Sequence, residues 1–318
     1  MKELTLRRVE SSAGYPIFSH FTARKPSDMG GFNIGGINST GQIPSFPGNY
    51  GLVDRDTPAD AFYKVSYTNP SQQLQLVFSD EFNTDGRTFY PGDDPYWEAV
   101  DLHYWATNNL EWYDPEAVVT RDGFLEVSLS RKDTHGLQYQ GGMISTWNKF
   151  CFTGGLLEVS VTLPGANNVM GLWPAVWSMG NLGRAGYGAS LEGMYVSWIA
   201  DARLAWTLRA GGVAADDRVQ ISGRPVPQEP MYLIINLGMS ENFGGVDFDH
   251  LTLPATMRVD WVRVYQPLRE INVGCDPADF PTQAYINENI DAYTNPNLTT
   301  WTDDYGKSFP KNRFLGQC

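Results

Sequence analysis

The middle of the chain alternates apolar and polar residues with a period of two. In residues 155–163, apolar side chains at 157, 159, 161 and 163 face away from Glu158, Ser160 and Thr162, as in a strand with one buried face. The same alternation at residues 123–130 places Leu125 and Val127 together. Further strands are predicted at residues 74–82, around 173–177, and at 143–147, 195–199, 204–208, 231–237 and 257–265. No long stretch has helical periodicity, so the pattern predicts an all-β protein.

The alternation is missing at both ends of the chain. Residues 1–73, rich in Gly, Pro, Ser and Asn, are predicted to be an irregular N-terminal extension. Residues 74–267 hold the strands, and residues 268–318 are predicted to be a tail that wraps over them. Within the strand-rich part, the aromatic and acidic residues 89–118 predict a long ordered loop.

Composition narrows the fold and the possible partners. Short strands between Gly, Pro, Asn and Asp clusters point to a β-sandwich or barrel. The formal charge of -13 argues against nucleic acid and anionic membrane surfaces as partners, and it fits a neutral partner such as a glycan. No run of 18 apolar residues is present, so no spanning segment is predicted, and the N-terminus has no apolar signal-peptide region.

Paired tryptophans are the first candidate binding feature. Trp173, Ala175 and Trp177 fall on one face of a predicted strand. Two flat rings separated by a small residue make a platform on which a sugar ring could stack, whereas the alternative places both rings in the core. No metal or cofactor is predicted, because the histidines have no metal-ligand spacing and no phosphate-binding loop is found. These histidines are His20, His103, His135 and His250.

Several long segments resemble known proteins. Residues 140–165, 171–180 (GLWPAVWSMG), 229–239 and 253–266 resemble successive strands of the family-sixteen glycoside hydrolases. Residues 30–44, 76–105, 108–118 (NNLEWYDPEAV), 179–190 and 271–277 resemble a narrower group, the fungal proteins associated with β-1,6-glucan synthesis. The resemblance covers nearly all of the chain from about residue 14 onward.

The resemblance implies a fold, a process and a cellular location. The fold is a concanavalin-like β-jelly-roll sandwich with a concave glycan-binding face, and the process is building the β-glucan of the fungal cell wall. Members of the group are membrane-anchored glycoproteins of the secretory pathway or cell surface, but this chain has no visible anchor ahead of residue 14. The candidate glycan-stacking residues are Trp97, Trp105, Trp112, Trp173 and Trp177.

The catalytic motif of the family-sixteen enzymes is missing from this sequence. Family-sixteen enzymes carry a Glu-x-Asp-x-x-Glu strand that supplies a nucleophile and a general acid/base, and a retaining mechanism needs the two carboxyls about 5–5.5 Å apart. No glutamate of this chain begins that motif. In the group, the catalytic strand follows a string like residues 186–194, whereas here Met194 runs directly into Tyr195. We therefore predict an internal shortening near 194/195, no catalytic residues and an inactive chain.

Three functions stay open at this point. The chain could be a glycosidase or transglycosylase acting on β-glucan, which the resemblance supports and the missing carboxylates oppose. It could instead be a non-catalytic glucan-binding or scaffold protein. It could also be an inactive, shortened product of the parent gene.

Three cysteines and two sequons complete the predicted sites. In the secretory pathway, Cys275 and Cys318 are expected to pair, because that bridge would tie down the tail, and Cys151 is expected to stay free and buried. The sequons at Asn38 and Asn297 are candidate N-glycosylation sites.

Overall fold

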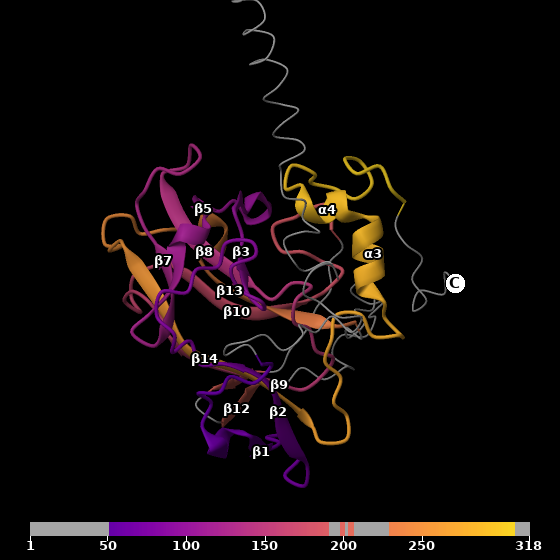
Figure 1. Cartoon of the computed structure of the whole chain (residues 1–318). Coiled ribbons are helices and arrows are strands. Elements are labelled where there is room, and N and C mark those ends of the chain that lie inside the picture. The colour runs from indigo at the N-terminus through magenta and orange to yellow at the C-terminus, as the bar shows by residue number, and fades with distance from the viewer. Residues whose placement is uncertain (1–50, 191–197, 201–202, 207–228, 309–318) are drawn as a thin grey trace, which may run out of the picture.

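Two six-stranded sheets form the body of the molecule (Figure 1). The computed structural model describes residues 51–190, 198–200, 203–206 and 229–308. The predicted all-β sandwich is confirmed within these residues. No helix among them is long and apolar enough to cross a membrane.

The first sheet has the strand order β1-β2-β14-β7-β6, with β9 paired to the other side of β14. The long strand β14 holds this sheet together, since its first half pairs with β7, its second half with β2, and its opposite edge with β9. The strands are β1 (Tyr63–Val65), β2 (Gln73–Asp80), β6 (Val118–Arg121), β7 (Phe124–Leu129), β9 (Leu156–Thr162) and β14 (Ala255–Pro267).

The second sheet has the order β10-β13-β8-β5-β4, and β3 pairs with β8. Its strands are β3 (Glu98–Ala99), β4 (Leu102–His103), β5 (Glu111–Tyr113), β8 (Tyr139–Ser145), β10 (Trp173–Gly180) and β13 (Met231–Gly238). A separate two-stranded sheet joins β11 (Trp198–Ala200) to β12 (Arg203–Trp206).

The helices are short and lie outside the sheets. They are α3 (Thr282–Glu288), α4 (Ile290–Thr294) and the 3-10 turns η3 (Ala59–Ala61), η4 (Trp105–Thr107), η5 (Pro115–Ala117) and η7 (Glu241–Phe243). In Figure 1, α3 and α4 (yellow) lie on the opposite side of the view from β7.

The main core lies between the two sheets, where alternate residues of facing strands meet. Leu125, Val127 and Leu129 of β7 are fully buried there, as their spacing predicts. They pack in one cluster with Ile235 and Leu237 of β13. Burial of these apolar side chains is the main source of the sandwich's stability.

Two predicted irregular regions contain strands. The stretch 89–118 is not a simple loop, because β5 pairs in parallel with β8 and antiparallel with β4. The strand β1 lies inside the predicted N-terminal extension and pairs with β2. Short strands of two or three residues are too brief for a period-two pattern to be recognised, which explains why the sequence did not reveal them.

The start of the tail is fixed by a disulfide that differs from the predicted one. Cys275 is bonded to Cys151, with Cα atoms 4.9 Å apart and a sequence separation of 124. The predicted Cys275–Cys318 bridge is therefore wrong, as is the prediction of a free Cys151. Phe152 bridges Val273, and Gly274 N–H donates to the Cys151 carbonyl at 2.8 Å. This antiparallel return of the chain after β14 brings the two cysteines together.

Helices α3 and α4 then pack onto the second sheet. Ile286, Tyr293 and Trp301 join a buried cluster with Trp147 and Tyr232. Both helices belong to the predicted tail, and Cys318 at its end lies outside the described residues.

Candidate functional site

One face of β13 passes from a covered apolar region to an open polar one. Tyr232 and Ile234 are buried in the cluster that includes the tail. The next residue on the same face, Asn236, lines an open cavity, and Gly238 follows it. Because alternate residues of a strand share a face, this single strand sets where the tail ends and where the cavity begins.

The cavity lies on the outer face of the second sheet and has a volume of about 330 Å³. Strands β5, β8, β10 and β13 contribute to it, together with the segment that includes η4. Its lining residues are Tyr104, Thr107, Asn109, Tyr113, Met143, Trp173, Ala175, Trp177 and Asn236. We call this cavity the cleft.

The predicted tryptophan platform lies in the cleft. Trp173, Ala175 and Trp177 all line it, as their shared face predicts. The Trp177 ring is held in place because its Nε1 donates to Asn236 Oδ1 at 2.8 Å. The strand register sets Ala175 opposite Asn236, so the small residue leaves room between the two rings. Aromatic faces next to amide and hydroxyl groups are suited to a ligand that has both apolar faces and polar edges.

Trp97 is excluded as a stacking residue. It is 0% exposed, packs against Phe78 and Phe82, and donates from Nε1 to Asp80 Oδ2 at 3.0 Å. The prediction that Trp97 stacks on a glycan is wrong, because its ring is buried in the core and its N–H is hydrogen-bonded to the buried Asp80 carboxylate.

Trp105 and Trp112 lie outside the cleft. Trp105 is 39% exposed and lines a neighbouring hollow that shares Tyr104 with the cleft. Trp112 neighbours the cleft residue Tyr113 on β5 and therefore points to the opposite face. There its ring lies 4.3 Å from that of His135, and its Nε1 donates to Asp101 Oδ1 at 2.7 Å.

The sequence did not single out the polar residues of the cleft. No sequence pattern marks these residues, which are Asn109, Tyr113 and Asn236. The first and the last of them are 127 positions apart in the chain. Only the pairing of β5 with β8 and of β8 with β13 brings them together. A possible sequence signal was the NNLEWYDP string itself, which places two asparagines next to an alternating Glu111 and Tyr113.

A buried carboxylate lies beneath these polar residues. Glu111 is 0% exposed, and it accepts hydrogen bonds from Asn109 Nδ2 at 2.6 Å and from the Met239 N–H at 3.0 Å. Burial raises the pKa of Glu111 from 4.5 to about 7, although these hydrogen bonds favour the ionised form. None of the described residues that line the cleft is Asp or Glu, so none of them presents a carboxylate to a ligand.

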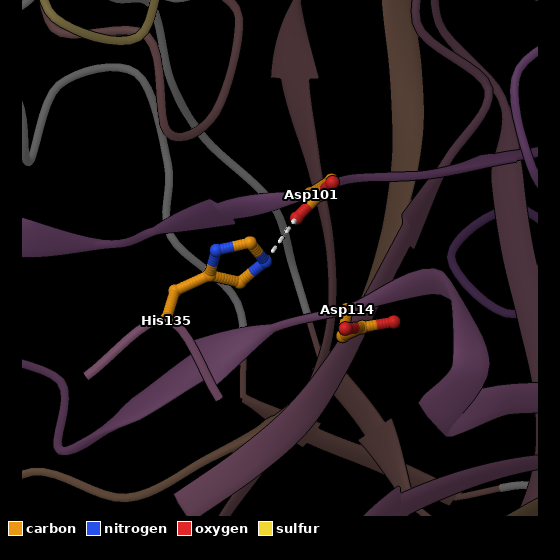
Figure 2. Close-up of side chains that lie close together, drawn as sticks. All are labelled: Asp101, Asp114 and His135. Carbon is orange, nitrogen blue, oxygen red and sulfur yellow. Dashed lines mark ion pairs between the residues drawn. The ribbon is translucent and has the colours of Figure 1, made fainter. Parts of the chain in front are cut away.

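One other group of side chains has the donor set of a metal site. Asp101, Asp114 and His135 bring their ligand atoms within 4.8 Å of one another on the surface near β4 and β5 (Figure 2). His135 Nε2 lies 3.8 Å from Asp101 Oδ1. Asp101 already accepts from Trp112, and Asp114 accepts from the Glu116 N–H at 2.8 Å. The cluster is accounted for by these protein contacts, and we assign no ion to it.

Of the two predicted sequons, one lies within the described residues. Asn297 is exposed, and its N–H donates to Asn295 Oδ1 at 3.0 Å. Asn38 lies outside the described residues.

Comparisons with known proteins match both halves of the chain. A sequence model described as "Beta-glucan synthesis-associated protein SKN1/KRE6/Sbg1" matches residues 4–196 and 194–318. SKN1 of Candida albicans is 33% identical over 83% of this chain and 54% of its own length. KRE6 of Saccharomyces cerevisiae is 31% identical over 84% of this chain and 56% of its own length. The chain thus spans about half the length of these curated relatives.

A solved structure supports the predicted jelly-roll fold. The catalytic domain of an endo-1,3-beta-glucanase (laminarinase) from Thermotoga petrophila RKU-1 superposes with a TM-score of 0.50. It is 22% identical and covers 62% of this chain and 99% of the laminarinase domain. At this identity the likeness shows the fold alone.

The alignments also contain positions that this chain lacks. The alignment with SKN1 runs over 405 positions, which exceeds the 318 residues of the whole chain. The two matches to the family meet at residues 194–196, where the sequence predicts an internal shortening.

Proposed function

This chain belongs to the family of β-glucan synthesis-associated proteins described as SKN1/KRE6/Sbg1, and we propose that it serves β-glucan synthesis by binding a β-glucan chain in the cleft. The proposal is for binding without hydrolysis. It comes from the chemistry of the cleft residues and from the association of the relatives with β-glucan synthesis.

The observation that carries the proposal is the pair of cleft tryptophans on β10. Trp173 and Trp177 are four residues apart on one strand, which corresponds to about 13 Å, so more than one sugar ring could lie along them. The apolar faces of pyranose rings suit such aromatic surfaces, and the polar side chains of Asn109, Asn236 and Tyr113 line the same cleft.

The described residues that line the cleft include no carboxylate, which supports binding over hydrolysis. A retaining glycosidase needs a nucleophile and a general acid/base on either side of the scissile bond. Glu111 is buried under the cleft floor and has no second carboxylate partner among the described cleft residues. The two-part family match at residues 194–196 supports an internal shortening that removes the catalytic strand.

The disulfide and the exposed glycosylation sequon both fit a location in the secretory pathway. The Cys151–Cys275 disulfide is of the kind that forms and persists in oxidising compartments. The exposed Asn297 sequon is compatible with glycosylation there. Both features agree with a protein that meets glucan at the cell surface.

The test is titration calorimetry with β-1,3- and β-1,6-linked gluco-oligosaccharides, together with a reducing-end assay. We expect weak binding by the chain and no reducing ends above a heat-killed control. Trp177→Ala should lower the affinity about fivefold, because an aromatic ring contact is worth roughly 1 kcal/mol.

Trp112→Ala is the matched control, since it removes a half-buried tryptophan from the opposite face of the same sheet. Its affinity should equal that of the unmodified chain. Equal losses in both variants, or glucan hydrolysis that survives repurification, would contradict binding without hydrolysis in this cleft.

A further inference from the structure

Three polar side chains converge over a glycine at one end of the cleft. A Cβ placed on Gly238 would lie 2.7 Å from Tyr113 Oη, 2.9 Å from Glu111 Oε1 and 3.1 Å from Asn109 Nδ2. Any other residue at position 238 would displace at least one of these atoms. The missing side chain of Gly238 therefore makes the room in which Glu111, Tyr113 and Asn109 meet.

A continuous path of hydrogen bonds joins Glu111 to the tryptophan platform. Asn109 Nδ2 donates to Glu111 Oε1 at 2.6 Å and lies 3.1 Å from Tyr113 Oη, to which it also donates. Asn236 Nδ2 donates to the same hydroxyl at 3.2 Å. Trp177 Nε1 then donates to Asn236 Oδ1 at 2.8 Å. We call Glu111, Asn109, Tyr113 and Asn236 the Glu111 cluster.

Every member of this path except Glu111 also lines the cleft. The orientation of Asn236 sets the plane of the Trp177 ring, and the orientation of the Tyr113 hydroxyl sets which amide groups Asn109 and Asn236 present to a ligand. Glu111 itself is enclosed, but the hydrogen bonds connect it to residues that line the cleft.

The ionised carboxylate matches the groups around it. Asn109 Nδ2 and the Met239 N–H are donors only, and the hydrogen bond from Tyr113 also lowers the pKa of Glu111. Protonation would turn one acceptor oxygen into a donor. Tyr113 Oη already accepts two amide N–H groups, so the new proton would break at least one bond of the cluster.

Other titratable groups lie on the elements around the cluster. On β5 and the preceding segment these are Tyr113 and Tyr104, and burial raises the pKa of Tyr113 well above its ordinary value. From β4, His103 Nε2 donates to the Asn109 carbonyl at 2.8 Å. On β8, Tyr139 lies opposite Glu111 in the ladder. The exposed Glu241 lies on η7 after β13 and takes no part in the hydrogen bonds of the cluster.

We propose that Glu111 is a positioning residue whose ionisation holds the Glu111 cluster and the Trp177 ring in the arrangement that binds glucan. The cleft binds more tightly when Glu111 is ionised and more weakly when it is protonated. This deepens the proposed function and rests on it for the identity of the ligand. The raised pKa of Glu111, about 7, puts the change near neutral pH.

The first measurement needs no ligand. The indole N–H resonance of Trp177, assigned by its loss in Trp177→Phe, is followed by NMR from pH 5.5 to 8.5, a range centred on the pKa of about 7. We expect it to titrate with a midpoint near 7 in the unmodified chain. It should not titrate in Glu111→Gln, and it should titrate unchanged in the control Glu241→Gln.

The second measurement is glucan affinity at the two ends of this range. Loss of one hydrogen bond of the cluster should weaken binding about two- to tenfold at the acidic end. Glu111→Gln should bind equally at both ends, while Glu241→Gln should keep the pH dependence.

The outcomes separate this inference from the proposed function. If the Trp177 indole resonance of the unmodified chain does not change with pH, the role of Glu111 is overturned even if glucan binds. A titration retained in Glu111→Gln would overturn it too, because a group other than Glu111 would then be responsible. A resonance that titrates as expected while no glucan binds at any pH would support the role of Glu111 and contradict the proposed ligand.

Discussion

At the scale of single residues, burial decides what each candidate side chain can do. Trp97 and Trp177 look alike in sequence, yet Trp97 donates to buried Asp80 inside the core and Trp177 donates to Asn236 beside the cleft. Glu111 is enclosed like Trp97, but its hydrogen bonds lead to the cleft. Exposure alone therefore does not identify the residues that shape the site.

The buried charge of Glu111 predicts how stability depends on pH. The pKa is raised from 4.5 to about 7 in the folded protein, so the folded state binds a proton more tightly than the unfolded state. The contribution of this group to stability is full below pH 4.5 and is lost as the pH rises through about 7. The loss should amount to about 3 kcal/mol, an order-of-magnitude value from 1.36 kcal/mol for each unit of pKa.

This loss of stability is measured by urea unfolding of the unmodified chain and of Glu111→Gln between pH 4.5 and about 7. The free energy of unfolding of the unmodified chain should fall relative to that of Glu111→Gln as the pH rises. A difference that is constant with pH would show that Glu111 does not titrate in this range. Stability and glucan affinity are thus expected to change in opposite directions with pH, as when a strained group is retained for function.

At the scale of elements, short segments without a sequence pattern complete the second sheet and fix the tail. The three residues of β5 supply both Glu111 and Tyr113. The segment before α3 is held by the Cys151–Cys275 disulfide and by the bridge from Phe152 to Val273. The tail is therefore part of the folded body and covers the second sheet next to the cleft.

Removal of this disulfide should destabilise the whole chain. For a bond that closes 124 residues of sequence, loop-closure entropy predicts a loss of about 4–5 kcal/mol in the free energy of unfolding. The variant Cys151→Ser/Cys275→Ser, measured by urea unfolding, should show this loss. Cys318→Ser is the control and should match the unmodified chain. A Cys275–Cys318 peptide in non-reducing mapping would contradict the connectivity.

At the scale of the whole molecule, the two sheets end at strands that are neighbours in sequence. Among the described strands, β9 pairs with β14 alone and β10 with β13 alone. Val161 is 38% exposed and Leu163 is 62% exposed, although alternation predicts both on a buried face. The proposed internal shortening at residues 194–196, where the two family matches meet, would explain both edges.

Such edges predict a tendency to aggregate. Unpaired ladder groups next to exposed apolar side chains favour pairing between molecules, so the purified chain should bind a hydrophobic dye and aggregate on mild heating. Val161→Lys/Leu163→Lys should reduce both effects, since charge on an edge strand opposes such pairing. A sharp, reversible melt without dye binding in the unmodified chain would contradict open edges.

The sequence by itself determined the all-β class, the long strands, the buried face of β7 and the shared face of Trp173 and Trp177. These follow from local periodicity, which needs no knowledge of distant residues. The tertiary structure alone decided the Cys151–Cys275 pairing, the burial of Trp97 and the convergence of Glu111, Asn109 and Tyr113 on Gly238. Each of these depends on which strands become neighbours, and strand neighbours are set by the packing of the whole sandwich rather than by any one segment.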